Sequence, residues 1–442
     1  MPIVVKPSLE RAWPVAADRV SRWLERRERV DGLFEGLPAG LSGPERARCQ
    51  HLLFGVIRHA GRIESALDRL IAHPPRFITR AVLFLAGFEL LEGLGAAADP
   101  GLPARIVHHA VDRTKELASP AEAGLVNAVG RKLSEMLSAQ AEPGRLASAA
   151  VLAEYYSHPE WMVRRWLATF GAEATRRLLV WNQTPHSLFL RWRGAPGAAP
   201  EWLKATDWGG FFGAPPGRHS EVEALVREGL AYIQDPGTRF AVELLAPQPG
   251  ELVLDLCAAP GGKSVLIADS MGTGRLVAFD LPGERLVRLK ENLSRIRGVE
   301  AVLVPGDIVR GAAGNLEARG FPDAFSAVLI DVPCSNTGVM RHRVDVKWRL
   351  LESDLVRHPR QQLALLSAAS RLVAPGGRIV YSTCSIDPAE NEQVVADFVK
   401  HTPAFELEAR AVALPWEAGH DGVGAFRLRR TAAAATGPDR RP

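Results

Sequence analysis

Apolar residues recur at helical spacing through the first third of the chain. In the stretch ARCQHLLFGVIRHAGRIESALDRLIA they include Leu52, Val56, Ile63 and Leu67, close to the three- and four-residue steps of one helix face. The segments RFITRAVLFLAGFELLEGLG, PARIVHHAVDRTKELA and AGLVNAVGRKLSEML continue the pattern, and no strand-like alternation interrupts them. We therefore expect residues 1–140 to form an all-α domain.

From about residue 246 the pattern changes to short apolar runs that alternate with amphipathic stretches. We expect strands at ELVLDLC, RLVAFDL, AVLVPGD, FSAVLIDVP and RIVYSTCS. Helices are expected over residues 263–270, 284–297, 357–373 and 389–402. This alternation predicts a mostly parallel sheet with helices on both faces, an α/β Rossmann-like domain over residues 246–430. We expect the tail, residues 431–442, to be disordered.

Tryptophan and arginine are concentrated between these two domains. Six of the ten tryptophans lie from Trp161 to Trp208, and arginines stand at positions 164, 165, 176, 177, 191 and 193. Aromatic rings interleaved with guanidinium groups suit stacking on bases and pairing with phosphates. This predicts a small RNA-binding subdomain over residues 150–245, with Arg164 and Arg165 among its RNA contacts. The alternative is that the tryptophans form a buried helix face.

The composition narrows the class of protein. With 442 residues, 47% hydrophobic and 24% charged, the chain resembles an ordinary globular protein, and its net charge of +4 is compatible with an anionic partner. Neither a secretory signal nor an apolar run of membrane-spanning length is visible, so we expect a cytoplasmic protein without a membrane partner. The four cysteines show no C-x-x-C spacing, so we expect no metal and no disulfide framework.

The stretch LDLCAAPGGKS begins within the first expected strand and ends like a phosphate-binding P-loop. A Walker A loop requires glycine where Cys257 stands, and Pro260 has no N–H to offer a phosphate. A Walker B-like strand does end at Asp331, but the two failures argue against an NTPase. The two glycines and the helix that they open suit instead a ligand that carries a carboxylate.

Aspartates end four successive expected strands: Asp255, Asp280, Asp307 and Asp331. An acid at the end of the second strand can accept both hydroxyls of a ribose, whereas several acids around one crevice repel pyrophosphate. S-adenosylmethionine suits this set, because it has a sulfonium, an ammonium, an adenosine and one carboxylate. NAD fits less well, since G-x-G-x-x-G is absent. A lone aspartate is usually a cap or turn residue, but four at successive strand ends argue against that for the set.

Cys334, in DVPCSNTG, and Cys384, in YSTCSIDP, follow the fourth and fifth expected strands. If those strands are neighbours, both thiols face the cofactor crevice. A thiolate is suited to adding to an electron-poor ring, and methylation of a pyrimidine at carbon-5 needs such an addition at carbon-6. Asp331 is placed to hydrogen-bond the pyrimidine edge and stabilise the developing charge. These residues alone leave the two thiol roles interchangeable, and a free cysteine is more often a small buried hydrophobe.

Three stretches together resemble a known family. DLCAAPGGKS, DVPCSNTGVMRHRVDVKW and YSTCSIDPAENEQVV resemble motifs I, IV and VI of the Sun family of RNA 5-methylcytosine methyltransferases. The N-terminal segment, through RAVLFLAGFELL, is similar to a NusB-like RNA-binding domain, a combination typical of the bacterial group that acts on small-subunit rRNA. The resemblance implies methyl transfer from S-adenosylmethionine to carbon-5 of a cytosine in RNA. The alternatives are tRNA or large-subunit rRNA as substrate, or a non-catalytic RNA-binding assembly factor.

The resemblance also implies a role for each matching residue. Cys384 would be the nucleophile, Cys334 the thiol that aids product release, and Asp331 a contact to both the target base and the cofactor. Asp280 would hold the ribose and Asp307 the adenine side. The remaining cofactor contacts would come from the motif I loop: Cys257, Ala258, Ala259, Pro260, Gly261, Gly262 and Lys263.

Motif IV departs from the family pattern D-A-P-C-S-G-T-G, because Val332 and Asn336 replace alanine and glycine. Asparagine tolerates a left-handed backbone better than other non-glycine residues, so we expect the turn to persist. The basic residues that follow, beside Trp348, are expected to meet RNA phosphates: Arg341, Arg343, Lys347 and Arg349. The alternative for them is a solvated helix face. We expect the protein to be monomeric.

Overall fold

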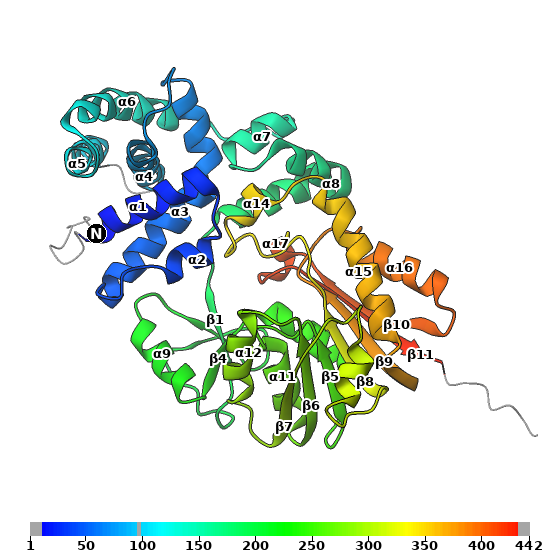
Figure 1. Ribbon diagram of the computed structural model, residues 1–442. Coiled ribbons are helices and arrows are strands. Elements are labelled where there is room, and N and C mark those ends of the chain that lie inside the picture. Colours follow the sequence, from blue (N-terminus) through cyan, green and yellow to red (C-terminus); the bar gives the residue numbers. More distant parts are fainter. Residues whose placement is uncertain (1–10, 95–98, 432–442) are drawn as a thin grey trace, which may run out of the picture. The chain divides into compact units, whose positions relative to one another are not determined.

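The computed structural model describes residues 11–94 and 99–431 (Figure 1). The chain divides into two compact units. The helical unit comprises Met1–Pro185 and Met340–Leu350, and the α/β unit comprises His186–Val339 and Leu351–Pro442. Apart from Thr431, the tail predicted to be disordered lies outside the described residues.

The helical unit confirms the all-α prediction for the N-terminal domain. Its helices are α1 (Ala12–Arg26), α2 (Val30–Glu35), α3 (Gly43–Asp68), α4 (Phe77–Gly93), α5 (Leu102–Leu117), α6 (Pro120–Ala139), α7 (Ala149–Tyr155), α8 (Glu160–Gln183) and α14 (Val346–Arg349). The residues at helical spacing in α3, such as Leu52 and Val56, are buried in a core shared with α1, α4 and α6. A capping box starts α3: the Glu45 N–H donates to the Ser42 hydroxyl, and the Ser42 N–H donates to the Glu45 carboxylate.

The subdomain predicted for residues 150–245 is divided between the two units. Its helices α7 and α8 belong to the helical unit, whereas its strands belong to the α/β unit. In α8, Trp166 is buried together with Met162 and Val163, so the alternative of a buried helix face is correct for this tryptophan. The helix is interrupted at Gly171, where φ is 79°.

A small antiparallel sheet opens the α/β unit. Its strands are β1 (Leu188–Trp192), β2 (Lys204–Ala205), β3 (Phe211–Ala214) and β4 (Ala231–Ile233), in the order β2-β3-β1-β4. Helix α9 (His219–Arg227) lies between β3 and β4 in the chain. Leu190, Leu203, Val222 and Ala231 form the buried cluster of this subdomain.

The main sheet has seven strands in the order β10-β11-β9-β8-β5-β6-β7 (Figure 1). They are β5 (Leu252–Leu256), β6 (Gly274–Asp280), β7 (Val299–Pro305), β8 (Phe325–Asp331), β9 (Val373–Thr383), β10 (Phe405–Ala413) and β11 (Val423–Arg430). β5 to β9 pair in parallel, while β11 pairs antiparallel with both β9 and β10. The predicted Rossmann-like fold is confirmed, and the hairpin of β10 and β11 adds an antiparallel edge that the alternation pattern did not predict.

Helices cover both faces of this sheet. The α-helices that follow the small sheet in this unit are α10 (Arg239–Leu245), α11 (Gly262–Met271), α12 (Arg285–Leu293), α13 (Ala312–Glu317), α15 (Asp354–Ser370), α16 (Glu392–His401) and α17 (Pro415–Ala418). A 3-10 turn, η2 (Pro236–Thr238), precedes α10. One buried cluster joins α10 and α11 to the sheet, and another joins α13, α15 and α16. Since the central strands are buried on both sides, they read as continuous apolar runs.

The strand register determines which residues share the carboxyl edge of the sheet. Leu256 of β5 pairs with Phe279 of β6 and with Ile330 of β8. Asp331, the next residue of β8, pairs with Ser382 of β9. The motif I loop, Asp280, Asp331 and both cysteine loops therefore leave the sheet from adjacent strands at one edge.

Candidate active site

The loop from Cys257 to Gly262 connects β5 to α11 and is fastened from both sides. Its backbone turns through left-handed conformations at Cys257 and Gly261, where φ is 57° and 106°. The Ala259 N–H donates to the Asp280 carboxylate at 2.7 Å, and the Asn292 side-chain amide donates to the Pro260 carbonyl oxygen at 2.8 Å. Asp280 thus lies directly against the loop.

Asp255 has a different place from the other strand-end acids. Its carboxyl group is fully buried and accepts a hydrogen bond from the Ser264 hydroxyl at 2.5 Å. Burial, partly offset by Ser264, raises the pKa of Asp255 to about 7. Asp255 therefore supports the first turn of α11 from beneath and is not accessible to a ligand, so three of the four strand-end acids remain as candidate ligand contacts.

Lys263 of motif I and Asp331 of motif IV form an ion pair. Lys263 Nζ lies 2.7 Å from Asp331 Oδ2. Burial alone would lower the pKa of the ammonium, but the Asp331 carboxylate more than offsets this, and the pKa of Lys263 is raised. Because the pair is partly exposed, with 32% of the Asp331 side chain accessible, the carboxylate also remains open to a ligand.

Asp307, the third strand-end acid, is partly exposed and accepts backbone N–H groups from Val309 at 2.8 Å and Arg310 at 3.3 Å. These bonds make it a turn residue, the usual role of an isolated aspartate after a strand. Its position at the carboxyl edge, one strand beyond Asp280, is as the sequence predicts.

The two thiols predicted to converge do so. Cys334 Sγ and Cys384 Sγ are 3.1 Å apart, and both cysteines are free. They differ in exposure: only 7% of the Cys334 surface is accessible, whereas Cys384 is partly exposed. The hydrogen bond to Cys384 and burial raise the pKa of the Cys334 thiol well above its ordinary value.

Sequence reasoning missed the group that holds the two cysteine loops together, the buried carboxyl of Glu390. It accepts hydrogen bonds from the Ser335 N–H at 2.9 Å and from the Ser335 hydroxyl, both next to Cys334. The Ser385 hydroxyl, next to Cys384, donates to the same carboxyl at 2.6 Å, and the Gln362 amide donates at 2.8 Å. The helix expected over residues 389–402 would place Glu390 in its first turn, but α16 begins only at Glu392.

Gly338 brings the same two loops into backbone contact. Its N–H donates to the Cys384 carbonyl oxygen at 3.0 Å, and its carbonyl oxygen accepts from the Gly422 N–H at 2.9 Å. A Cβ at this position would lie 2.7 Å from the Gly422 carbonyl oxygen and 2.8 Å from that of Cys384. Only glycine fits here, so the T-G of the motif has a steric cause.

The predicted RNA contacts differ in exposure. Arg164 and Arg343 are exposed, and Arg165 is partly buried in α8. The Arg341 guanidinium lies 4.1 Å from the centre of the Trp181 ring and donates to the Pro185 carbonyl oxygen at 2.7 Å. It is therefore already engaged within the helical unit.

The prediction that Lys347 meets RNA phosphates is wrong. Only 2% of this residue is exposed, and its ammonium donates to the Arg58 carbonyl oxygen at 2.8 Å. Burial, and secondarily the positive charge of Arg58, lower the pKa of Lys347 well below its ordinary value. The adjacent Trp348 donates its indole N–H to the Ile57 carbonyl oxygen at 2.8 Å, so α14 is anchored to α3.

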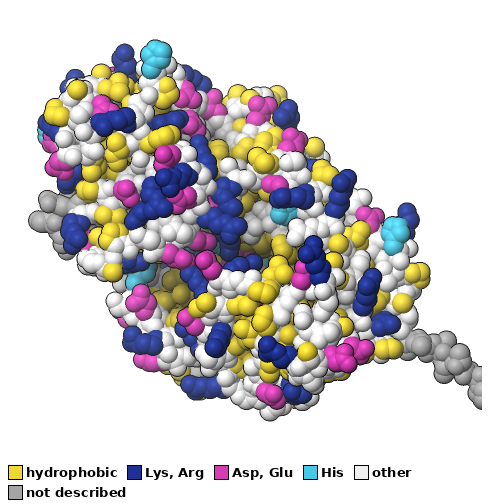
Figure 2. Space-filling model, viewed as in Figure 1, with side chains coloured by type: hydrophobic (Ala, Val, Ile, Leu, Met, Phe, Trp, Pro, Cys, Tyr) yellow, Lys and Arg dark blue, Asp and Glu magenta, His cyan; other side chains and the backbone are white. Residues whose placement is uncertain are grey.

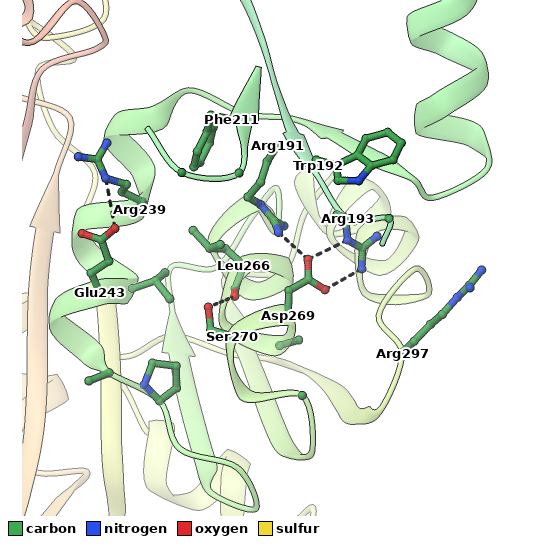
Figure 3. Close-up of a pocket in the computed structure, with 18 residues that line it drawn as sticks. Arg191, Trp192, Arg193, Phe211, Arg239, Glu243, Leu266, Asp269, Ser270 and Arg297 are labelled. Atoms are coloured by element: carbon green, nitrogen blue, oxygen red, sulfur yellow. Dashed lines mark hydrogen bonds and ion pairs between the residues drawn. The ribbon is translucent and has the colours of Figure 1, made fainter. Parts of the chain in front are cut away.

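Two arginines of the Trp/Arg-rich stretch also turn inward. Figure 3 shows Arg191 and Arg193 of the β1 region converging on Asp269 of α11. Arg191 contacts one carboxylate oxygen at 2.7 Å, and Arg193 contacts both, at 2.8 and 2.9 Å. They line a cavity of about 680 Å³. Since their charges are paired with Asp269, they fix the small sheet to the Rossmann-like domain.

On the visible face of the α/β unit, Figure 2 shows Lys and Arg side chains scattered among acidic and apolar ones. Among residues 11–94 and 99–431, no cluster of three or more His, Cys, Asp or Glu side chains is arranged to hold a metal ion. No helix in that part of the chain is both long and apolar enough to cross a bilayer.

Fold and sequence comparisons define the class of protein. The crystal structure of PH0851 superposes with a TM-score of 0.75 at 21% identity, covering 95% of this chain and 99% of that one. A methyltransferase homologue from Pyrococcus horikoshii gives a TM-score of 0.53 at 24% identity, covering 64% and 99%. Residues 15–135 match the NusB family, and residues 242–425 match the family described as 16S rRNA methyltransferase RsmB/F. The chain is thus a NusB domain joined to a methyltransferase domain.

Curated relatives identify the family. The chain is 30% identical to ribosomal RNA small subunit methyltransferase B of Klebsiella pneumoniae subsp. pneumoniae over 415 residues, 89% of this chain and 91% of the relative. It is 31% identical to the protein of the same name from Sodalis glossinidius over 423 residues, 91% and 92% of the two chains. This protein belongs to the ribosomal RNA small subunit methyltransferase B family, and the resemblance inferred from its motifs is confirmed.

Proposed function

We propose that the protein methylates carbon-5 of a cytosine in small-subunit rRNA, with S-adenosylmethionine as methyl donor and Cys384 as covalent nucleophile. The observation that carries this proposal is the 3.1 Å approach of Cys334 and Cys384 at the sheet edge that also holds the motif I loop. Two thiols so placed, beside a carboxylate, suit addition to a pyrimidine ring and subsequent elimination. The names of the curated relatives supply the small-subunit rRNA as substrate.

The residues at the carboxyl edge fit S-adenosylmethionine. Asp280, which lies against the motif I loop, would accept ribose hydroxyls, and Asp307, which follows the neighbouring strand, would lie on the adenine side. The one lysine of the loop, Lys263, is paired with Asp331, so its charge is already balanced without a polyphosphate. The N-terminus of α11 offers N–H groups to a carboxylate. When bound there, the cofactor supplies an electrophilic methyl group.

The protein's own residues account for the activation of the base. The Cys384 thiolate adds to carbon-6 of the cytosine, which makes carbon-5 nucleophilic. Asp331 hydrogen-bonds the ring edge near nitrogen-3 and stabilises the charge that develops on addition. After carbon-5 is methylated, its proton passes to a solvent base and the Cys384 sulfur leaves carbon-6 as a thiolate, which restores the aromatic ring. We assign aid in that release to Cys334.

The difference between the thiols supports this assignment of roles. Cys384 is partly exposed and can reach a base, whereas Cys334 is buried and its raised pKa keeps it protonated. A nucleophile needs access and a thiolate, whereas a protonated thiol 3.1 Å away can hydrogen-bond to the sulfur as that sulfur leaves carbon-6. The residues by themselves left the roles interchangeable, and the exposure favours Cys384 as the attacking thiol.

The proposal is tested by tritium transfer from methyl-labelled S-adenosylmethionine to purified 16S rRNA, with 23S rRNA and tRNA as parallel substrates. We expect label in 16S rRNA alone, and bisulfite sequencing should then locate it at one cytosine. Label in tRNA or 23S rRNA would show that this RNA, and not 16S rRNA alone, is a substrate. No label in any RNA, including RNA from cells that lack the protein, would leave an RNA-binding assembly factor as the function.

A further inference from the structure

Asn336, which stands where the family pattern has glycine, touches the proposed nucleophile. Its backbone is left-handed, with φ of 59°, a conformation that asparagine tolerates. Its side chain bridges the two cysteine loops: Nδ2 donates to the Cys334 carbonyl oxygen at 2.8 Å, and Oδ1 accepts from Cys384 Sγ at 3.2 Å. A glycine at this position could make neither contact.

The orientation of this amide is fixed by its partners. A carbonyl oxygen can only accept, so the Cys334 carbonyl requires the NH₂ end of the Asn336 side chain to face it. The oxygen end is therefore left facing the Cys384 sulfur. Turning the amide over to donate to the sulfur would set two oxygen acceptors against each other at the Cys334 carbonyl. The side chain thus offers the sulfur an acceptor and no donor.

We propose that Asn336 is a positioning residue for Cys384: its amide oxygen accepts the S–H of the resting nucleophile and holds the sulfur on the motif IV loop as the thiol. A hydrogen bond to the neutral form of a group disfavours its charged form. Asn336 therefore keeps the Cys384 thiolate scarce in the absence of RNA. This inference rests on the proposed role of Cys384 as the nucleophile.

Other groups also act on the Cys384 sulfur. Cys334 is its sulfur neighbour, and Lys263 of α11 interacts with it electrostatically while paired with Asp331 of β8. Glu390, behind both loops, acts on Cys334. A substitution at position 336 does not change the chemical identity of these four groups, so a comparison among variants of that position tests the contribution of the amide.

The test measures alkylation of Cys384 by iodoacetamide against pH, read by mass spectrometry of its peptide, without RNA or cofactor. In Asn336→Gly, which fits the left-handed backbone, the midpoint of the profile should move down by about half to one pH unit, or about three- to tenfold faster alkylation near neutral pH. In Asn336→Asp, the carboxylate opposes the thiolate, and the midpoint should move up. Asn315→Asp, at an exposed asparagine of α13, is the matched control and should behave as the wild type.

The shape of the profile separates protonation from loosening of the loop. The rate at high pH reports access to the sulfur, and the midpoint reports its protonation. A raised high-pH rate with an unmoved midpoint in Asn336→Gly would mean that Asn336 only packs the loop, and would overturn the proposal. So would shifts of the same sign in both variants. Because no methyl transfer is measured, the result stands apart from the outcome of the rRNA assay.

Discussion

Residues 331–339 and residues 340–350 follow one another within one sequence motif, yet they belong to different units of the structure. In the first segment, Cys334 and Gly338 place their atoms against Cys384. In the second, Lys347 and Trp348 donate to backbone carbonyl oxygens of α3, and Val344 is buried in the helical core. One half of the motif contributes to the proposed catalytic site, and the other anchors the chain in the helical unit that contains the NusB domain.

The comparison shows that a charged or polar residue near this motif can serve either the proposed catalytic site or the stability of the helical unit. In residues 331–339, polar side chains lie in small, satisfied networks around a thiol. In residues 340–350, Lys347, which the sequence predicts to contact a phosphate, is one of the most buried side chains of its unit. Substitutions in the first segment, and in the residues that contact it, should therefore change catalysis. Substitutions at the anchored positions of the second should change stability or nothing.

The largest effect is expected from Cys384→Ser. A serine hydroxyl does not ionise near neutral pH, so addition to carbon-6 should fail and the methylation rate should fall at least about a thousandfold. Cofactor binding, measured by calorimetry, should be unchanged, because the motif I loop is not altered. The control is Cys49→Ser, a buried cysteine of the helical unit. Full activity in Cys384→Ser would refute its role as nucleophile.

Cys334→Ala should separate addition from release. If Cys334 assists elimination, the variant adds to cytosine but cannot leave it, and a covalent RNA–protein complex should accumulate. A denaturing gel of the variant with rRNA and cofactor should show a slower band that disappears in the double variant with Cys384→Ser. Normal turnover without a shifted band would remove Cys334 from the reaction.

Glu390→Ala should disturb both cysteine loops at once. It leaves two N–H donors and two hydroxyls around a buried site without their acceptor, at a cost of about 1–3 kcal/mol in the free energy of unfolding. Because the loops lose their common partner, we expect kcat to fall about tenfold or more. Glu390→Gln is the matched control, since its amide oxygen can face the N–H donors while the Ser335 and Ser385 hydroxyls rotate to accept. Equal defects in both variants would show that charge, not geometry, matters.

The extent to which the sequence predicts this site has a physical explanation. Strands buried on both faces are visible as apolar runs, so their ends, with Asp280, Asp331 and the two cysteines, could be placed in order. The convergence of the thiols followed because β8 and β9 are neighbours. Glu390 was missed because PAENEQVV is consistent with a helix start, and its true partners lie up to 55 residues away in the chain. Lys347 was misjudged for the same reason, since its acceptor is 289 residues away.

The smallest effect should come from Lys347→Met, which tests the anchoring half of the motif. The folded-state pKa of Lys347 is lowered, so the unfolded chain binds the proton more tightly. Stability of the wild type should therefore rise as pH increases from the folded pKa of this group toward the unfolded value near 10.4. Methionine has no proton to lose, so the variant should lack this rise and match or exceed the wild type at pH 7 in thermal melting.

The KM of Lys347→Met for rRNA and the salt dependence of its RNA binding should be unchanged. Arg343→Met, at an exposed position of the same segment, should weaken RNA binding and reduce its salt dependence if that arginine meets a phosphate. A raised KM in Lys347→Met, with melting unchanged, would contradict the division of the motif between chemistry and anchoring.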